Sequence, residues 1–147
     1  MESILKILNM GLPGSGKSTL AKPFADLIDG VWLNADTVRE TYNDWDFSLQ
    51  GRNRQASRMK YLADGVVLSG KTAVCDFVCP THLARAEFNA DFTVWMDTIK
   101  ESKFEDTNKI FENPTKCDYH VSKWFDDTQE TLMLAVNRYT NWKGNIV

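Results

Sequence analysis

The chain has 147 residues, of which 43% are apolar and 25% are charged, and its formal net charge at pH 7 is −3. These values are typical of a globular domain with a real core, and the negative charge argues against a general nucleic-acid binder. No apolar run approaches the length of a membrane span, and the first strand begins too early to leave room for a signal peptide. We therefore expect one cytoplasmic domain over residues 1–147, without a membrane partner.

The three cysteines, Cys75, Cys79 and Cys117, do not form a metal-binding or disulfide pattern. Their number is odd, and no Cys-x-x-Cys pair or nearby histidine cluster accompanies them. We expect reduced thiols, as in a cytosol, with Cys75 packed inside a buried strand.

Strand-like and helix-like patterns alternate along the chain. In order, we expect a strand at 4–10, helix 17–28, strand 31–34, short helix 36–41, helix 52–69, strand 72–78, short helix 81–88, strand 92–97, irregular segment 98–118, short strand 119–121 and helix 128–140. The run at 72–78 is nearly all apolar, which is typical of a buried parallel strand. The alternation predicts an α/β fold, with a mostly parallel sheet flanked by helices in three layers.

Residues 11–18 read Gly-Leu-Pro-Gly-Ser-Gly-Lys-Ser, which is the G-x-x-x-x-G-K-[ST] phosphate-binding loop. The motif lies between a predicted strand and a predicted helix, where backbone N–H groups and a helix N-terminus can face one phosphate. We expect Lys17 to act in catalysis by reaching the β- and γ-phosphates of ATP, and Ser18 to ligate Mg²⁺. The expected nucleotide-binding residues are Gly11, Pro13, Gly14, Ser15, Gly16, Lys17, Ser18 and Thr19. The motif and its context predict a P-loop kinase fold that binds ATP and Mg²⁺.

Polar residues follow the predicted strands, where ligands bind in open parallel sheets. Asp36 and Arg39 follow the strand at 31–34 and face one side of a helical turn. Asp36 would orient or deprotonate an acceptor hydroxyl while Arg39 binds an anionic group; the alternative is a helix N-cap beside a solvated arginine. Asp76, which ends the strand at 72–78, either holds Mg²⁺ through water or is hydrogen-bonded at the strand end.

Three arginines, Arg52, Arg54 and Arg58, lie within two turns of the helix predicted at 52–69. Arginine suits phosphate and sulfate groups because its planar fork matches their oxygens. We expect at least one of the three to meet such a group and at least one to lie on a solvated helix face.

Several short motifs resemble those of the adenylylsulfate (APS) kinase family. Residues 33–39, Leu-Asn-Ala-Asp-Thr-Val-Arg, are similar to the family's Leu-Asp-Gly-Asp-x-Val-Arg, and residues 46–48 followed by Arg52 are similar to Phe-Ser-x-x-Asp-Arg. Residues 77–80, Phe-Val-Cys-Pro, resemble Phe-Ile-Ser-Pro. Phe104 and residues 111–114 resemble the family's Gly-Phe-Thr-Gly-Ile-Asp-x-Pro-Tyr-Glu-x-Pro. The likeness runs, with gaps, over most of the chain.

The resemblance implies an ATP-dependent kinase that phosphorylates the 3′-hydroxyl of adenylylsulfate. By this likeness Asp36 is the catalytic carboxylate, and the implied substrate-binding residues are Asp36, Arg39, Phe47, Arg52, Gln55, Phe77 and Phe104. Arg39 and Arg52 would hold the phosphosulfate, and Phe47 and Phe104 would stack on the adenine. Relatives of this family often dimerise, which leaves a homodimer open.

The chain also departs from the family pattern. Asp-Gly-Asp is replaced by Asn34-Ala35-Asp36, the aspartate before Arg52 by Gly51, and an asparagine by Gln55. The family's basic lid segment, Arg-Asp-x-Lys-Gly-Leu-Tyr, is absent, since only residues 98–103 separate Asp97 from Phe104. Two alternatives therefore stay open: a kinase for a nucleoside, a sugar acid or a polynucleotide 5′-hydroxyl, and a nucleotide-binding module with little turnover.

Overall fold

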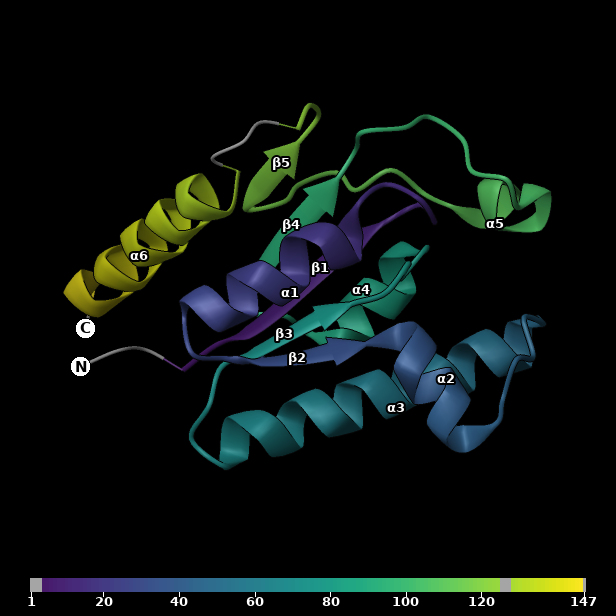
Figure 1. Cartoon of the computed structure of the whole chain (residues 1–147), viewed down its shortest axis with the longest axis horizontal. Coiled ribbons are helices and arrows are strands. Elements are labelled where there is room, and N and C mark those ends of the chain that lie inside the picture. The colour runs from purple at the N-terminus through teal and green to yellow at the C-terminus, as the bar shows by residue number, and fades with distance from the viewer. Residues whose placement is uncertain (1–3, 125–127, 147) are drawn as a thin grey trace.

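The computed structural model describes residues 4–124 and 128–146, with side chains described up to Asn141. In chain order the elements are β1 (Lys6–Gly11), α1 (Lys17–Leu27), β2 (Val31–Asn34), α2 (Ala35–Tyr42), α3 (Leu49–Leu68), β3 (Ala73–Asp76), α4 (His82–Phe88), β4 (Phe92–Met96), α5 (Glu105–Ile110), β5 (Tyr119–Val121) and α6 (Thr128–Ile146). The strands form one sheet in the order β2-β3-β1-β4-β5, and every neighbouring pair is parallel. Helices cover both faces of this sheet (Figure 1).

Two apolar clusters, one on each face of the sheet, form the core. Ile7 of β1 packs with Phe24 of α1 and Leu132 of α6, whereas the next residue, Leu8, packs with Met59 of α3 on the opposite face. Successive side chains of a strand point to opposite faces, so a central strand covered on both sides is apolar throughout. The α/β class and the three layers expected from the sequence are confirmed.

Most predicted elements are present, and the differences have local causes. The helix predicted at 52–69 begins earlier, at Leu49, because the Ser48 hydroxyl accepts a hydrogen bond from Gly51 N at 3.2 Å and caps it. The strand predicted at 72–78 ends at Asp76, and the chain turns at Cys79, whose φ is 44°. The expectation of an irregular segment at 98–118 is wrong over α5.

Cys75 lies in a buried strand, as the sequence predicted. Cys75 is fully buried in β3 and Cys79 is buried just after it, while Cys117 is partly buried. All three are free thiols, and burial raises the pKa of Cys79 to about 12. Within the described residues, no helix combines the length and apolar character needed to cross a membrane.

Candidate active site

The glycine loop lies between β1 and α1, at the carboxyl edge of the sheet (Figure 1). A Cβ on Gly11 would lie 2.5 Å from the Met96 carbonyl oxygen, so no larger residue fits where the loop passes β4. Gly16, with φ of 97°, is the residue before α1 and takes a conformation that favours glycine. The loop is braced from outside because Thr98 Oγ1 donates to Ser15 O at 2.7 Å. This rigid cradle is open to a phosphate at the N-terminus of α1.

Lys17 supplies a partly buried positive charge without an anionic partner in contact. Its Nζ donates to Leu12 O at 3.0 Å, and no ion pair within the described residues involves it. Burial lowers the Lys17 pKa to about 8, although the charges of Asp76 and Asp36 oppose this change. A bound polyphosphate would provide the missing counter-charge, so the loop fits ATP.

Four side chains meet at the metal-binding end of the loop. Ser18 Oγ donates to Asp76 Oδ1 at 3.3 Å, and Trp32 Nε1 donates to Asp76 Oδ2 at 2.5 Å. Asn34 Nδ2 lies 3.1 Å from Ser18 Oγ and 3.2 Å from Asp76 Oδ1, to which it also donates. Burial raises the Asp76 pKa, and the hydrogen bonds from Trp32 and Asn34 oppose that effect.

These groups fit Mg²⁺ in its usual coordination. The cation prefers oxygen ligands and keeps several waters beside one or two protein groups and substrate phosphates. Ser18 and Asp76 offer a hydroxyl and a carboxylate oxygen at 3.3 Å from each other. Within the described residues, no group of three or more His, Cys, Asp or Glu side chains is arranged to hold a metal ion, so water and phosphate would complete such a site.

A cleft of about 710 Å³ extends from the glycine loop across the carboxyl edge of the sheet. Its lining residues are Pro13, Gly14, Gly16, Lys17, Ser18, Thr19, Asn34, Ala35, Asp36, Trp45, Phe47, Arg52, Asp76, Phe77, Val78, Phe104, Asp106 and Thr107. The size is that of a small-molecule site. The cleft thus brings together most of the residues that the sequence analysis selected.

Asp36 lies exposed in the first turn of α2, on the cleft and near Lys17. The alternative in which Asp36 caps this helix is wrong, because the cap is Asn34, whose side chain accepts from Thr37 N at 3.0 Å. The Asp36 carboxylate is therefore free to face an acceptor hydroxyl in the cleft.

Aromatic side chains form the walls of the cleft away from the glycine loop. Phe47 and Trp45 come from the segment before α3 and are 48% and 51% exposed, and Phe104 comes from the segment before α5 and is 56% exposed. Phe77, the residue after β3, lines the cleft but is buried. Half-exposed aromatic rings on a cleft suit a flat ligand such as a nucleobase.

The arginines that the resemblance assigned to the phosphosulfate are engaged elsewhere. Arg39 does not line the cleft: it is buried, its Nη1 donates to Asp44 O at 2.9 Å, and its guanidinium lies 4.2 Å from the Phe47 ring centre. Arg52 lines the cleft but donates from Nη2 to Thr107 Oγ1 at 2.9 Å. Both arginines hold the aromatic walls in place as the structure stands.

Other polar side chains of α3 lie away from the cleft. Gln55 is buried and donates from Nε2 to Ala35 O at 2.9 Å. Arg54 and Arg58 both pair with Asp44, at 3.1 and 2.7 Å. Of the three clustered arginines, Arg52 is thus the one that lines the cleft.

Sequence reasoning did not select Trp45, Asp106 or Thr107 as site residues. All three line the cleft from loops or from the short helix α5. Their positions depend on contacts between distant segments, such as the Arg52–Thr107 hydrogen bond across 55 positions. No motif or periodicity marked them.

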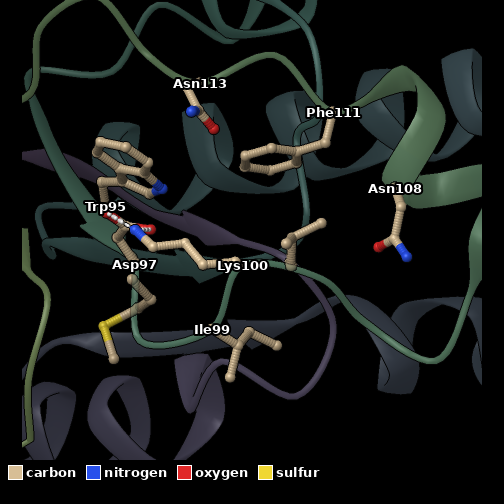
Figure 2. Close-up of a pocket in the computed structure, with 9 residues that line it drawn as sticks. Trp95, Asp97, Ile99, Lys100, Asn108, Phe111 and Asn113 are labelled. Atoms are coloured by element: carbon tan, nitrogen blue, oxygen red, sulfur yellow. Dashed lines mark hydrogen bonds and ion pairs between the residues drawn. The ribbon is translucent and has the colours of Figure 1, made fainter.

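A second, much smaller cavity of about 100 Å³ is lined by Leu12 and by residues of β4 and the segments that follow it. Figure 2 shows Phe111 and Asn113 facing Trp95 across it, with the Lys100 side chain directed to Asp97. The Lys100 Nζ lies 3.3 Å from Asp97 Oδ1. A nucleotide needs several times this volume, so the larger cleft is the candidate nucleotide site.

Comparison with known proteins adds a family to this geometry. The family model for adenylylsulphate kinase matches residues 4–107. A curated relative from Aeropyrum pernix, described as a probable adenylyl-sulfate kinase, is 35% identical over 81 residues. That alignment covers 51% of this chain and 44% of the relative, so the chain spans less than half the length of the curated relative it matches.

Solved structures share the architecture at low sequence identity. The Mycobacterium tuberculosis APS kinase in complex with AMPPNP and APS has a TM-score of 0.74 at 17% identity, covering 92% of this chain and 99% of that chain. A gluconokinase from Sinorhizobium meliloti has a TM-score of 0.61 at 14% identity, covering 96% and 94%. At these identities the likeness shows the fold alone, and it confirms the P-loop kinase fold expected from the sequence.

Proposed function

The chain belongs to the adenylylsulphate kinase family, and from that premise we propose that it transfers the γ-phosphate of ATP to the 3′-hydroxyl of adenylylsulfate. The observation that carries the proposal is the shared cleft: the Lys17 and Asp36 side chains lie on the same cleft as Phe47 and Phe104. One end of the cleft is built for phosphate and the other for a flat ring. An adenine nucleotide that also presents a hydroxyl satisfies both ends.

Each residue would have a role in phosphoryl transfer that follows from its place in the cleft. Bound Mg-ATP supplies the phosphoryl group and neutralises part of its charge. The glycine loop and Lys17 hold the phosphates, and Asp36 accepts a hydrogen bond from the acceptor hydroxyl so that its oxygen is in line for attack. Positioning and electrostatics provide most of the acceleration in such transfers.

The aromatic walls would fix the acceptor base. The Arg39 guanidinium, which does not line the cleft, packs 4.2 Å from the centre of the Phe47 ring and so fixes the position of that ring. Phe104 approaches from the segment before α5, and the Arg52–Thr107 hydrogen bond ties α3 to that helix. A ring between two held aromatic faces gains contact at little entropic cost.

The test measures ADP formation from ATP with Mg²⁺ and a panel of acceptors: adenylylsulfate, nucleosides, gluconate and a 5′-hydroxyl oligonucleotide. We expect turnover selective for adenylylsulfate, and a loss of roughly 10²–10⁴-fold in kcat for Asp36→Asn. Glu40→Gln is the matched control, because Glu40 is exposed on the same helix and does not line the cleft. Full activity of Asp36→Asn would remove Asp36 from the mechanism.

A second candidate acceptor, a nucleoside, is favoured by the charges around Arg52. The carboxylate of Asp106 lines the cleft 3.9 Å from Arg52 Nη2, and Arg39 is buried away from it. A phosphosulfate would meet only one arginine there, beside a carboxylate, whereas an uncharged acceptor would meet no repulsion. Turnover with nucleosides in the same panel would replace adenylylsulfate by that class, and ATP binding without any turnover would indicate a nucleotide-binding module.

A further inference from the structure

Asn34, at the end of β2, joins the capped end of α2 to the metal-binding end of the glycine loop. Its Oδ1 accepts hydrogen bonds from Thr37 N at 3.0 Å and from Thr37 Oγ1 at 3.2 Å. A backbone N–H can only donate, so the oxygen of the Asn34 amide must face α2. The amide nitrogen consequently faces Ser18 and Asp76, with Nδ2 at 3.1 Å from Ser18 Oγ and 3.2 Å from Asp76 Oδ1.

This orientation directs the Ser18 hydroxyl. A hydroxyl carries one hydrogen and two lone pairs. The hydrogen of Ser18 Oγ is directed to Asp76 Oδ1 at 3.3 Å, and one lone pair accepts from Asn34 Nδ2. The remaining lone pair is then the single direction in which Ser18 can bind a cation.

The identity of residue 34 also sets the charge beside Asp76. An aspartate would keep the cap of α2 but would place a carboxylate oxygen about where Nδ2 is, 3.2 Å from Asp76 Oδ1. Two carboxylates at that distance repel each other unless a cation or proton lies between them. With asparagine, Asp76 is instead held by N–H donors from Asn34 and Trp32.

We propose that Asn34 is a positioning residue that holds Ser18 and Asp76 ready for Mg²⁺ and replaces a second carboxylate by a neutral donor. The inference rests on the proposed function, since it takes Mg-ATP as the ligand of the cleft. Asn34 acts through its neighbours and needs no contact with the substrate.

The first test uses Asn34→Ser, which retains an N-cap side chain for α2 but no donor that reaches Asp76. ATP affinity is measured calorimetrically with Mg²⁺ and again with EDTA. We expect the affinity in EDTA to stay unchanged and the enhancement by Mg²⁺ to fall roughly 10–100-fold, the usual effect of losing a group that orients a metal ligand. Thr37→Ala is the matched control, because it removes only the hydroxyl contact to Asn34 Oδ1.

The second test uses Asn34→Asp with Mg²⁺ alone and reads thermal unfolding. We expect a lower Tm than wild type in EDTA and a larger rise in Tm on adding Mg²⁺, because the cation separates the two carboxylates. If Asn34→Ser does not fold, the Mg²⁺-dependent rise in the Tm of Asn34→Asp tests the proposal on its own. An unchanged Mg²⁺ enhancement in Asn34→Ser, an equal loss in Thr37→Ala, or no extra Mg²⁺ effect in Asn34→Asp would overturn it. Failure of the wild type to bind ATP at all would overturn the proposed function and this inference with it.

Discussion

Lys17 provides the sharpest test of the glycine loop, because the unliganded protein holds its charge in an unfavourable place. Burial lowers the Lys17 pKa from its ordinary value of 10.5 to about 8. At ~1.4 kcal/mol for each pKa unit, the ammonium costs the folded state about 3 kcal/mol. The Lys17→Met variant removes this cost but also loses the hydrogen bond to Leu12 O, which contributes about 1 kcal/mol. We therefore expect the variant to be more stable than wild type by about 2 kcal/mol at pH 7, which is roughly 4–8 °C in Tm for a chain of this length.

The pH dependence has a defined sign. Between about pH 8 and 10.5 the unfolded chain binds the Lys17 proton more strongly than the folded one. The free energy of unfolding of the wild type therefore rises with pH across this window, and the penalty is complete below pH 8. Other groups titrate in the same range, so the quantity that matters is the difference between wild type and Lys17→Met, which we expect to shrink towards pH 10.5.

The assay is urea unfolding of both proteins, without nucleotide, at intervals from pH 7 to 10.5. Lys116→Met is the control for the change in net charge, because Lys116 is exposed and outside the cleft. ATP affinity, measured in parallel, should fall in Lys17→Met while stability rises. A variant no more stable than wild type at pH 7 would refute the reasoning that burial strains this charge.

Three further substitutions test the two ends of the cleft. Gly11→Ala should abolish ATP binding and lower Tm, since its Cβ would lie 2.5 Å from the Met96 carbonyl oxygen. The control is Gly65→Ala on α3, where a Cβ meets nothing within 4 Å, and this variant should raise Tm slightly. Equal behaviour of the two variants would contradict the close approach of Gly11 to the Met96 carbonyl. Phe104→Ala should leave Tm and ATP affinity unchanged but raise the KM of a base-bearing acceptor roughly 5–150-fold, from ~1–3 kcal/mol of stacking; an unchanged KM would show that the acceptor base binds elsewhere. Phe47→Ala should raise the same KM and also lower Tm, because its ring packs on the Arg39 guanidinium.

The parts of the site that local sequence determines were predictable. The glycine loop carries its geometry in its own residues, and Asp36 follows a four-residue strand whose bounds, 31–34, the sequence predicted as observed. Each of these features depends on patterns within about ten residues, such as strand periodicity, a cap and a glycine turn. Such patterns are readable without knowing what lies opposite in the fold.

The arginines show why the remainder was not predictable. Whether Arg39 faces a ligand depends on the loop before α3, which folds back so that the carbonyls of Asp44 and Asp46 accept its hydrogen bonds at 2.9 and 3.2 Å. That fold needs Gly51, where a Cβ would lie 2.1 Å from the Asp46 carbonyl oxygen. A spacing of three residues places two side chains on one face of a helix but does not say which groups from elsewhere will meet them.

The cleft lining has few positive charges, because the segment between β4 and α5 contributes none to it. Among the described residues that line it, Lys17 and Arg52 are cationic, whereas Asp36, Asp76 and Asp106 are anionic. Carboxylates thus outnumber cations at a site proposed to hold polyphosphate, and the segment after Asp97 adds no basic side chain to the lining. Only a divalent cation reverses that balance before ATP binds, and like charges in a partly buried site repel strongly. The order proposed for Ser18, Asn34 and Asp76 therefore bears on how much Mg²⁺ strengthens ATP binding, because Lys17 and Arg52 are the only basic side chains among the described residues that line the cleft.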